Sequence, residues 1–127
     1  MHVNHYETVH QEAVDMEGAE RCQVRWLIGQ EDGAPHFAMR QYEVAAGGFT
    51  PHHHHPYEHE VFVLEGQGML LGPESEFPLR SGDVVYVAPN ELHQFRNTGE
   101  TALKFLCLIP HATTAADGAA ARDCAVE

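Results

Sequence analysis

The sequence predicts an all-β domain, a sandwich or barrel built from short strands. Between residues 21 and 110, six short apolar or alternating runs are separated at close intervals by Gly, Pro, Asn and Asp. That pattern is typical of strands joined in a meander and differs from the strand–helix alternation of parallel sheets. No amphipathic helix interrupts the runs, and 127 residues are enough to enclose one hydrophobic core.

Three segments follow one another along the chain. Residues 1–20 are polar and weakly periodic, which predicts an N-terminal arm with one short strand or turn. We expect the barrel over residues 21–110, with strands over residues 22–28, 36–44, 58–66, 68–72, 83–88 and 102–109. Residues 111–127 are small and Ala-rich, without apolar anchors, and predict a flexible or weakly helical C-terminal tail.

Composition excludes several classes of partner. The formal net charge is −12, and such an acidic surface repels nucleic-acid phosphates and anionic lipids, so we expect neither nucleic acid nor membrane as a partner. No apolar run approaches the ~18 residues of a membrane-spanning helix, and the first residues lack the basic and apolar regions of a secretion signal. We therefore expect a cytoplasmic protein. Cys22, Cys107 and Cys124 are odd in number and unclustered, which favours thiols over a disulfide framework.

Two of the predicted strands lack a polar face. The stretches VFVL, residues 61–64, and FLCLI, residues 105–109, are apolar at both parities, which requires cover on both sides of the sheet. A small barrel cannot cover both faces of every strand from its own chain. A second subunit packed on the outer face is the simplest solution, so we expect a homodimer.

A cluster of histidines stands out in FTPHHHHPYEHEVFVLEG, residues 49–66. Side chains at i and i+2 share a face of an extended chain, so His53 and His55 form one pair and His52 and His54 the opposite pair. Only one pair can face the interior. Three or four imidazole or carboxylate donors held at about 2.0 to 2.2 Å make a transition-metal site. The cluster therefore predicts a metal centre.

Further donors come from later segments. In the strand that follows the cluster, His59 shares one face with Val61 and Val63, while Glu60 lies on the other, so these two residues are rivals for the third ligand position. His93 follows a strand and a Pro-Asn turn, where a barrel could return it to the first histidines. The residues alone leave the choice between His59 and Glu60 open.

The segment from Gly48 to Gly66 resembles the first motif of the cupin superfamily, G-x5-H-x-H-x3-E-x6-G. Aligning the two glycines places the family's first two ligand histidines at His53 and His55, with an opening spacer of four residues in place of five. The motif's glutamate position, seven before Gly66, is occupied by His59. The register of this alignment favours His59 over Glu60 as the third ligand.

A second segment resembles the other cupin motif, G-x5-P-x-G-x2-H-x3-N. Its matching residues, in register, are Gly82, Asp83, His93 and Asn97. Ala88 replaces the usual proline and Asn90 the usual glycine; Asn is the residue that best replaces glycine at positive φ. The resemblance runs from residue 22 to residue 110. It implies a cupin fold, a double-stranded β-helix or jelly-roll barrel.

The chain also resembles a group of very small single-domain cupins whose metal, often manganese, is held by four histidines. HPYEHE and PNELHQFRN resemble segments that recur in that group. The resemblance implies that His53, His55, His59 and His93 hold a divalent transition metal. Manganese is the metal expected from that group, with iron, nickel, copper or zinc as alternatives, because the ligand set alone does not select among them.

The expected chemistry follows from this ligand set. Four neutral imidazoles leave the full charge on the ion, which favours an anionic ligand, and four protein donors leave two neighbouring positions open in an octahedral site. Cupins of this kind are often dioxygenases, so the first hypothesis is an oxygenase acting on a small organic substrate, aromatic or unsaturated. The alternatives are a non-catalytic domain that binds or senses a small ligand, and a metal-dependent isomerase or lyase. No catalytic acid or base can be identified.

Four further side chains are candidates for the wall of a substrate pocket. Phe105 and Cys107 share a parity in the last strand, Phe95 lies two residues after His93, and Met39 lies in the second strand. An aromatic wall would suit an aromatic or apolar substrate. For Phe105 the alternative is a place in the hydrophobic core.

Overall fold

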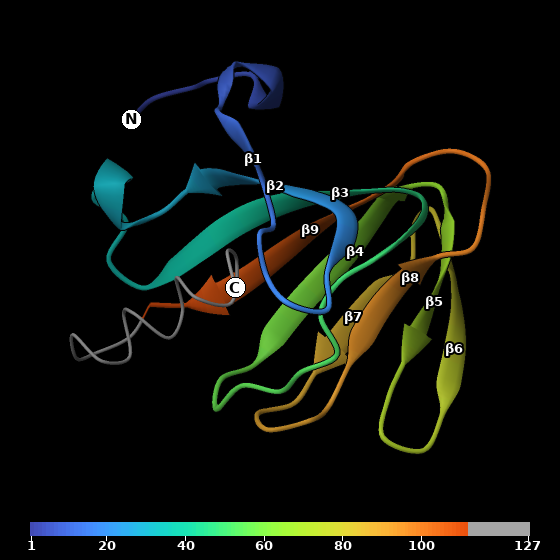
Figure 1. The fold of residues 1–127 in the computed structure, drawn as a ribbon. Coiled ribbons are helices and arrows are strands. Elements are labelled where there is room, and N and C mark those ends of the chain that lie inside the picture. Colours follow the sequence, from blue (N-terminus) through green and yellow to red (C-terminus); the bar gives the residue numbers. More distant parts are fainter. Residues whose placement is uncertain (112–127) are drawn as a thin grey trace.

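The computed structural model describes residues 1–111 as one strongly curled β-sheet with two short 3-10 helices, Tyr6–Thr8 and Gln30–Asp32 (Figure 1). The nine strands are β1 (Gln11–Ala13), β2 (Glu20–Ile28), β3 (Phe37–Phe49), β4 (His59–Glu65), β5 (Gln67–Leu71), β6 (Glu76–Arg80), β7 (Val84–Val87), β8 (Gln94–Asn97) and β9 (Leu103–Pro110). The tail predicted over residues 111–127 lies, beyond residue 111, outside the described residues. No helix within the described part of the chain is long and apolar enough to cross a membrane.

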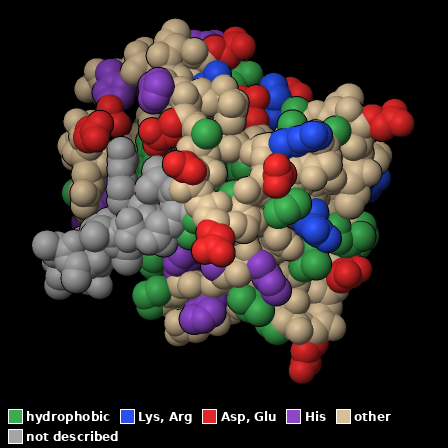
Figure 2. Space-filling view, viewed as in Figure 1, with side chains coloured by type: hydrophobic (Ala, Val, Ile, Leu, Met, Phe, Trp, Pro, Cys, Tyr) green, Lys and Arg blue, Asp and Glu red, His purple; other side chains and the backbone are tan. Residues whose placement is uncertain are grey.

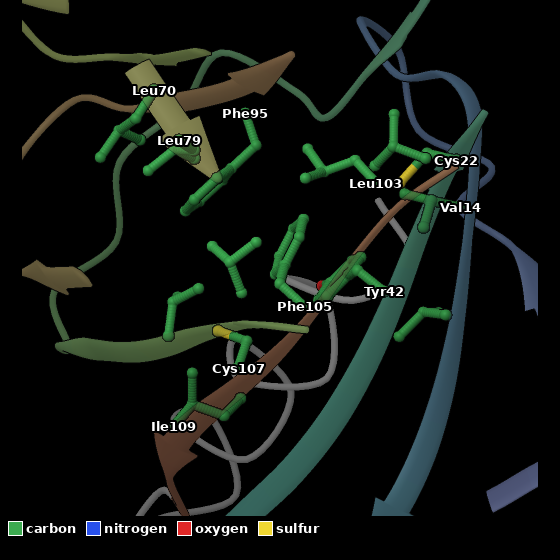
Figure 3. Close-up of a cluster of buried hydrophobic side chains, with 14 of the residues drawn as sticks. Val14, Cys22, Tyr42, Leu70, Leu79, Phe95, Leu103, Phe105, Cys107 and Ile109 are labelled. Atoms are coloured by element: carbon green, nitrogen blue, oxygen red, sulfur yellow. The ribbon is translucent and has the colours of Figure 1, made fainter. Parts of the chain in front are cut away.

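The pairing order along the sheet is β6-β5-β8-β3-β9-β4-β7, with β2 paired to β3 and β1 paired to β2. All the pairs are antiparallel. The sheet curls so that β5, β6 and β8 face β3, β4 and β9 across the interior (Figures 1 and 3). This arrangement is the predicted all-β barrel of cupin type, a curled sheet with β6 and β7 as its two ends.

All six predicted strands are present, but they do not form a simple meander. Strand β4 pairs with β7 and β9 rather than with the preceding strand β3, and β3 pairs with β9, more than fifty residues later in the chain. Two strands, β6 and β8, were not predicted. The arm, for which a short strand or a turn was predicted, contains the short strand β1, and Val14 just after it is buried in the core.

One turn shows how the second motif shapes the chain. Asn90 has φ +66°, the left-handed conformation that L-residues other than Asn rarely adopt. The replacement of the motif's glycine by Asn is therefore compatible with the backbone, as predicted. Glu91 Oε1 accepts a hydrogen bond from the Ala88 N–H, and the Glu91 N–H donates to the Ala88 carbonyl, so the turn leading to His93 is closed on both sides.

The core lies between the two layers of the curled sheet (Figure 3). Aromatic rings form its centre: Phe105 stacks on Tyr42 with centroids 5.2 Å apart and on Phe95 with centroids 4.6 Å apart. These rings are held by β3, β8 and β9, which join the two layers. One end of the aromatic stack continues towards the histidines, since the His93 and Phe95 rings are 6.3 Å apart.

The outer face of β4 and β7 carries exposed apolar side chains in the part of the chain that the structure describes. Along β4 the side chains alternate, with Val61 and Val63 buried and Phe62 and Leu64 exposed at 44% and 37%. Val84 of β7, paired with Phe62, is exposed at 75%. This is the apolar outer surface expected from the VFVL stretch.

Candidate metal centre

Two non-adjacent segments bring the histidines to one end of the barrel. His53 and His55 lie on the segment that joins β3 to β4, His59 is the first residue of β4, and His93 immediately precedes β8. His53 and His93 form an isolated antiparallel bridge: the His93 N–H donates to the His53 carbonyl at 2.9 Å and the His53 N–H to the His93 carbonyl at 3.2 Å. The backbone therefore fixes the spacing between the two motifs.

The four imidazole rings face one another. Ring centroids are 4.2 Å apart for His53 and His55, 5.1 Å for His53 and His93, and 4.9 Å for His59 and His93. The ring of His55 lies 5.6 Å from that of His59 and 6.2 Å from that of His93. Four imidazoles around one octahedral ion would have centroids about 4.5 Å apart at neighbouring positions and about 6.5 Å apart across it. Four of the five observed spacings lie in this range, and that of His53 and His55, at 4.2 Å, is slightly shorter.

The ring nitrogens are compatible with a common centre. The Nε2 atoms of His53 and His55 are 3.2 Å apart, close to the roughly 3 Å expected for two neighbouring ligands of one ion. The buried Nε2 of His59 has no hydrogen-bond partner among the described residues. His93 Nδ1 lies 2.8 Å from the Glu91 carbonyl, so an Nδ1–H donating to that oxygen leaves the Nε2 lone pair of His93 available.

The four candidate ligand side chains lie close together, but they do not have the arrangement of a formed metal site. No group of three or more His, Cys, Asp or Glu side chains within residues 1–111 already has the arrangement of a metal site. The centroid spacings are close to those of ligands to one ion, but the ring nitrogens of the described residues are not arranged around one point. The unpartnered, buried Nε2 of His59 is the feature that best fits a metal there, because a buried polar atom without a partner is costly.

Burial keeps the imidazoles of His53, His59 and His93 neutral, which is the form that binds metals. Removal from water, followed by the charges of neighbouring groups, lowers the pKa of His53 to about 3. Burial and then the nearby Arg40 guanidinium lower the pKa of His59 to about 2. Burial also lowers the pKa of His93, against the opposing effect of its hydrogen bond to the Glu91 carbonyl.

The parity expected within the histidine cluster is observed. His53 and His55 are half-buried and turned towards the other rings, whereas His52 and His54 are exposed. His59 is only 3% exposed, while Glu60 is exposed on the outer face. The space-filling view shows histidines near the lower end of the molecule beside apolar side chains, and acidic side chains spread over the rest of that face (Figure 2).

The opening glycine of the first motif is better assigned to Gly47 than to Gly48. Gly47 has φ +80°, the conformation that favours glycine, and counting from it gives the five-residue spacer to His53 that the motif requires. Gly48 is needed for a different reason, since a Cβ there would lie 2.6 Å from the Glu20 carbonyl oxygen. The backbone therefore requires glycine at both positions. With Gly47 as the opening glycine, the spacer to His53 has the usual five residues.

Arg40, which was not singled out from the sequence, lies at the base of the site with its side chain fully buried. Its guanidinium donates to the Tyr42 hydroxyl at 2.7 Å and to Cys107 Sγ at 2.9 Å, and its Nη2 lies 3.5 Å from Nδ1 of His59. The one available signal was its parity with Ala38 and Tyr42 on the inner face of β3. A buried cation beside the histidines adds positive charge to the site and favours an anionic group within it.

Three of the four candidate pocket residues lie beside the histidines. A cavity of about 20 Å³ is lined by His53, His59 and His93 together with Phe95, Phe105 and Cys107. Met39 does not line this cavity: it pairs with Ile28 and Leu108, between the inward-facing Ala38 and Arg40. Its parity is opposite to theirs, so Arg40 takes the place on the wall that was expected for Met39.

Comparisons with known proteins agree on the fold family. Residues 40–109, which contain all four histidines, match the family model Cupin_2, described as "Cupin domain". A polyketide cyclase from Streptomyces resistomycificus is similar in structure, with a TM-score of 0.82 and 33% sequence identity over 87% of this chain and 79% of the cyclase.

Two curated relatives match over shorter stretches. An oxalate-binding protein from Thermotoga maritima is 36% identical over 58 residues, which are 45% of this chain and 48% of that protein. A 1-methylthio-D-xylulose 5-phosphate methylsulfurylase from Rhodospirillum rubrum is 31% identical over 71 residues, 56% of this chain and 46% of the enzyme. The chain spans about half the length of these curated relatives.

Proposed function

Because this chain belongs to the cupin family, we propose that it is a metal-dependent enzyme that holds one divalent transition metal with His53, His55, His59 and His93 and acts on a small organic substrate. The observation that carries the proposal is the clustering of the four imidazole rings, together with the buried Nε2 of His59, which has no hydrogen-bond partner within residues 1–111. Manganese is the metal proposed first, with iron, nickel, copper and zinc as alternatives.

The residues around the histidines would orient the ligand rings. The Glu91 carbonyl accepts from Nδ1–H of His93 and so directs its Nε2 inwards, and Cys107 Sγ, 3.4 Å from Nδ1 of His59, can do the same for that ring. When bound, a divalent metal supplies a Lewis acid that polarises a substrate oxygen. The buried guanidinium of Arg40 would strengthen the preference for a carboxylate, enolate or similar anionic group at the same place.

Two classes of reaction are compatible with this site. The similarity to a polyketide cyclase favours chemistry on a carbonyl substrate that consumes no dioxygen, of lyase, cyclase or isomerase type. The oxygenase expected from the sequence is the second candidate, because four protein donors leave two neighbouring positions open. Metal-loaded protein mixed with catechols, diketones and polyketide-like polycarbonyl compounds, under nitrogen and under oxygen, separates the two. Turnover that survives under nitrogen supports the first class, and turnover that requires oxygen uptake supports the second.

A non-catalytic role is the remaining candidate. The similarity to an oxalate-binding protein over 58 residues favours it, since a dicarboxylate would suit a site with a dipositive ion and the Arg40 guanidinium. Calorimetric titration with oxalate tests this role. Tight, saturable binding without turnover of any compound in the panel would favour the binding protein over the enzyme.

We also propose that the protein is a homodimer. The outer surface formed by Phe62, Leu64 and Val84 is contiguous, because Phe62 and Val84 are paired across β4 and β7. A second copy of this chain offers the same apolar surface and can cover it by two-fold symmetry.

A further inference from the structure

A groove beside the metal site lies between the two ends of the curled sheet. It has a volume of about 350 Å³ and is lined by residues of β5 and β6, the turn between them, β7 and the loop that leads to β8. Its apolar wall is made of Leu70, Phe77, Tyr86, Val87 and Leu92. Small-molecule sites commonly begin at about 300 Å³, so the groove is large enough for a small organic molecule.

Phe77 faces the groove and lacks cover. It has the same parity as Leu79, which is buried on the inner face of β6, and it is paired with Leu70, which is also buried. Phe77 is nevertheless 52% exposed. An aromatic ring on the inner face of a sheet normally packs against the opposite layer. Here the groove separates Phe77 from that layer. An apolar ligand is the occupant that would complete this packing.

The groove adjoins the metal site through His93. This side chain lines both the groove and the histidine cavity. The histidine cavity, with about 20 Å³, is large enough for an ion or a water molecule but not for an organic substrate. Any substrate that reaches the metal must therefore keep most of its body outside that cavity, and the groove is the adjacent space with the required volume.

The polar residues of the groove indicate the charge of the ligand's body. Among the described residues, the polar groups that line the groove belong to Glu74, Ser75, Glu91 and His93 and to the Tyr86 hydroxyl, so its charged side chains are acidic. Carboxylates repel a second anionic group and accept hydrogen bonds from hydroxyl or amine donors. The body of the ligand should therefore be neutral, flat and apolar, with a donor group at its edge.

We propose that this groove binds the aromatic body of the substrate, with Phe77 stacking on it, while the reactive end of the substrate extends past His93 towards the metal. This assignment rests on the function proposed above and names the class of substrate: a neutral aromatic ring system that carries a hydroxyl donor. Phe77 is not one of the four proposed metal ligands: it belongs to β6, and of those four only His93 lines the groove.

The test uses 2-naphthol as the probe and the full-length chain without metal. Binding measured by ligand-observed NMR should weaken about five-fold or more in Phe77→Ala, since a stacked aromatic contact is lost. Phe77→Leu, which keeps the apolar volume, should lie between the two. Phe37→Ala is the matched control, because Phe37 is similarly exposed at 56% but lies at the start of β3 and does not line the groove. The anion 2-naphthoate should bind more weakly than 2-naphthol.

Metal loading then tests the connection to the histidines. Mn²⁺-loaded protein should broaden the resonances of bound 2-naphthol, whereas Zn²⁺-loaded protein should not, because only Mn²⁺ is paramagnetic. Equal affinity of the wild type, Phe77→Ala and Phe37→Ala for 2-naphthol would overturn the proposal that this groove binds the aromatic body. So would binding without broadening of the 2-naphthol resonances in protein shown to contain Mn²⁺. Failure of the protein to take up any metal would instead overturn the proposed function, and the metal-free comparison of Phe77→Ala with Phe37→Ala would still decide whether the groove binds the probe.

Discussion

The Nδ1 atom of His59 lies 3.4 Å from Sγ of Cys107, and the same sulfur accepts a hydrogen bond from the Arg40 guanidinium at 2.9 Å. Cys107 thus joins a buried cation to the histidine whose Nε2 has no hydrogen-bond partner in the described part of the chain. A group that accepts from Nδ1 of a ligand imidazole fixes the ring so that Nε2 faces the metal.

Replacement of Cys107 by Ala should therefore weaken Mn²⁺ binding about ten-fold or more, the usual effect of losing such a partner. Cys107→Ser keeps an acceptor and should recover much of the affinity. Competition with a chromophoric chelator measures both. The control is Cys22→Ala, since Cys22 is buried in the core at a distance from Cys107 (Figure 3). Equal affinity in Cys107→Ala and Cys22→Ala would contradict the role assigned to Cys107.

The backbone conformation of Asn90, in the turn before His93, restricts which residues can replace it without loss of stability. Its φ of +66° should make Asn90→Ala about 1 kcal/mol less stable than the wild type, because Cβ disfavours the left-handed conformation. Asn90→Gly should stay close to the wild type. Urea unfolding of the metal-free protein gives both free energies of unfolding. If Ala were tolerated as well as Gly, the positive φ would not be imposed by the fold in solution.

The apolar surface on β4 and β7 predicts the state of association. Phe62→Glu places a charge opposite its own copy near a two-fold axis and should convert a dimer, of twice the 14.1 kDa chain mass, to a monomer. Phe77→Glu changes an exposed phenylalanine on β6, outside this surface, and should remain dimeric. Light scattering coupled to size exclusion measures both masses. A monomeric wild type, or dissociation in both variants, would contradict the assigned interface.

Cys22 should react slowly with alkylating reagents in the folded protein. Burial raises the pKa of its thiol to about 12, and the thiolate is the reactive form, so at pH 8 only a very small fraction can react. The rate should rise with pH up to that value, provided that the fold persists, and unfolding in guanidinium should restore ordinary reactivity. Peptide mass spectrometry after timed iodoacetamide treatment follows this site separately from the other cysteines. Native and unfolded protein reacting equally fast would show that Cys22 is accessible.

Local patterns in the sequence were enough for much of the barrel. Six strands were predicted because each carries its alternation or apolar run within its own segment. Strand β6 was missed because it contains Pro78 and only Leu79 among its residues is buried. Strand β8 has only four residues and directly follows the turn at His93, so it is too short to show a recognisable alternating pattern. Pairing of β3 with β9 depends on the whole chain and could not be inferred from either segment.

For the candidate site, the sequence predicted the clustering of the histidines in the two motifs, and the metal that they would bind stays a prediction. The histidine positions followed from the cupin resemblance, and the parity of His52 to His55 followed from the period of an extended chain. Arg40 could not be identified in the same way, since Arg is rarely buried and its partners Tyr42 and Cys107 come together only after β3 and β9 pair. Met39 was expected on the pocket wall, but its parity is opposite to that of the inward-facing Ala38 and Arg40. The groove beside Phe77 depends on how the two ends of the sheet approach each other, which no local pattern records.

The most direct test of the account is the metal content of two neighbouring variants. His59→Ala and Glu60→Ala differ by one position on β4, with His59 turned to the other rings and Glu60 to the outer face. After incubation with Mn²⁺ and removal of the excess, plasma mass spectrometry should find about one metal per chain in the wild type and in Glu60→Ala, and almost none in His59→Ala. Full occupancy in His59→Ala together with loss of metal in Glu60→Ala would contradict a four-histidine centre.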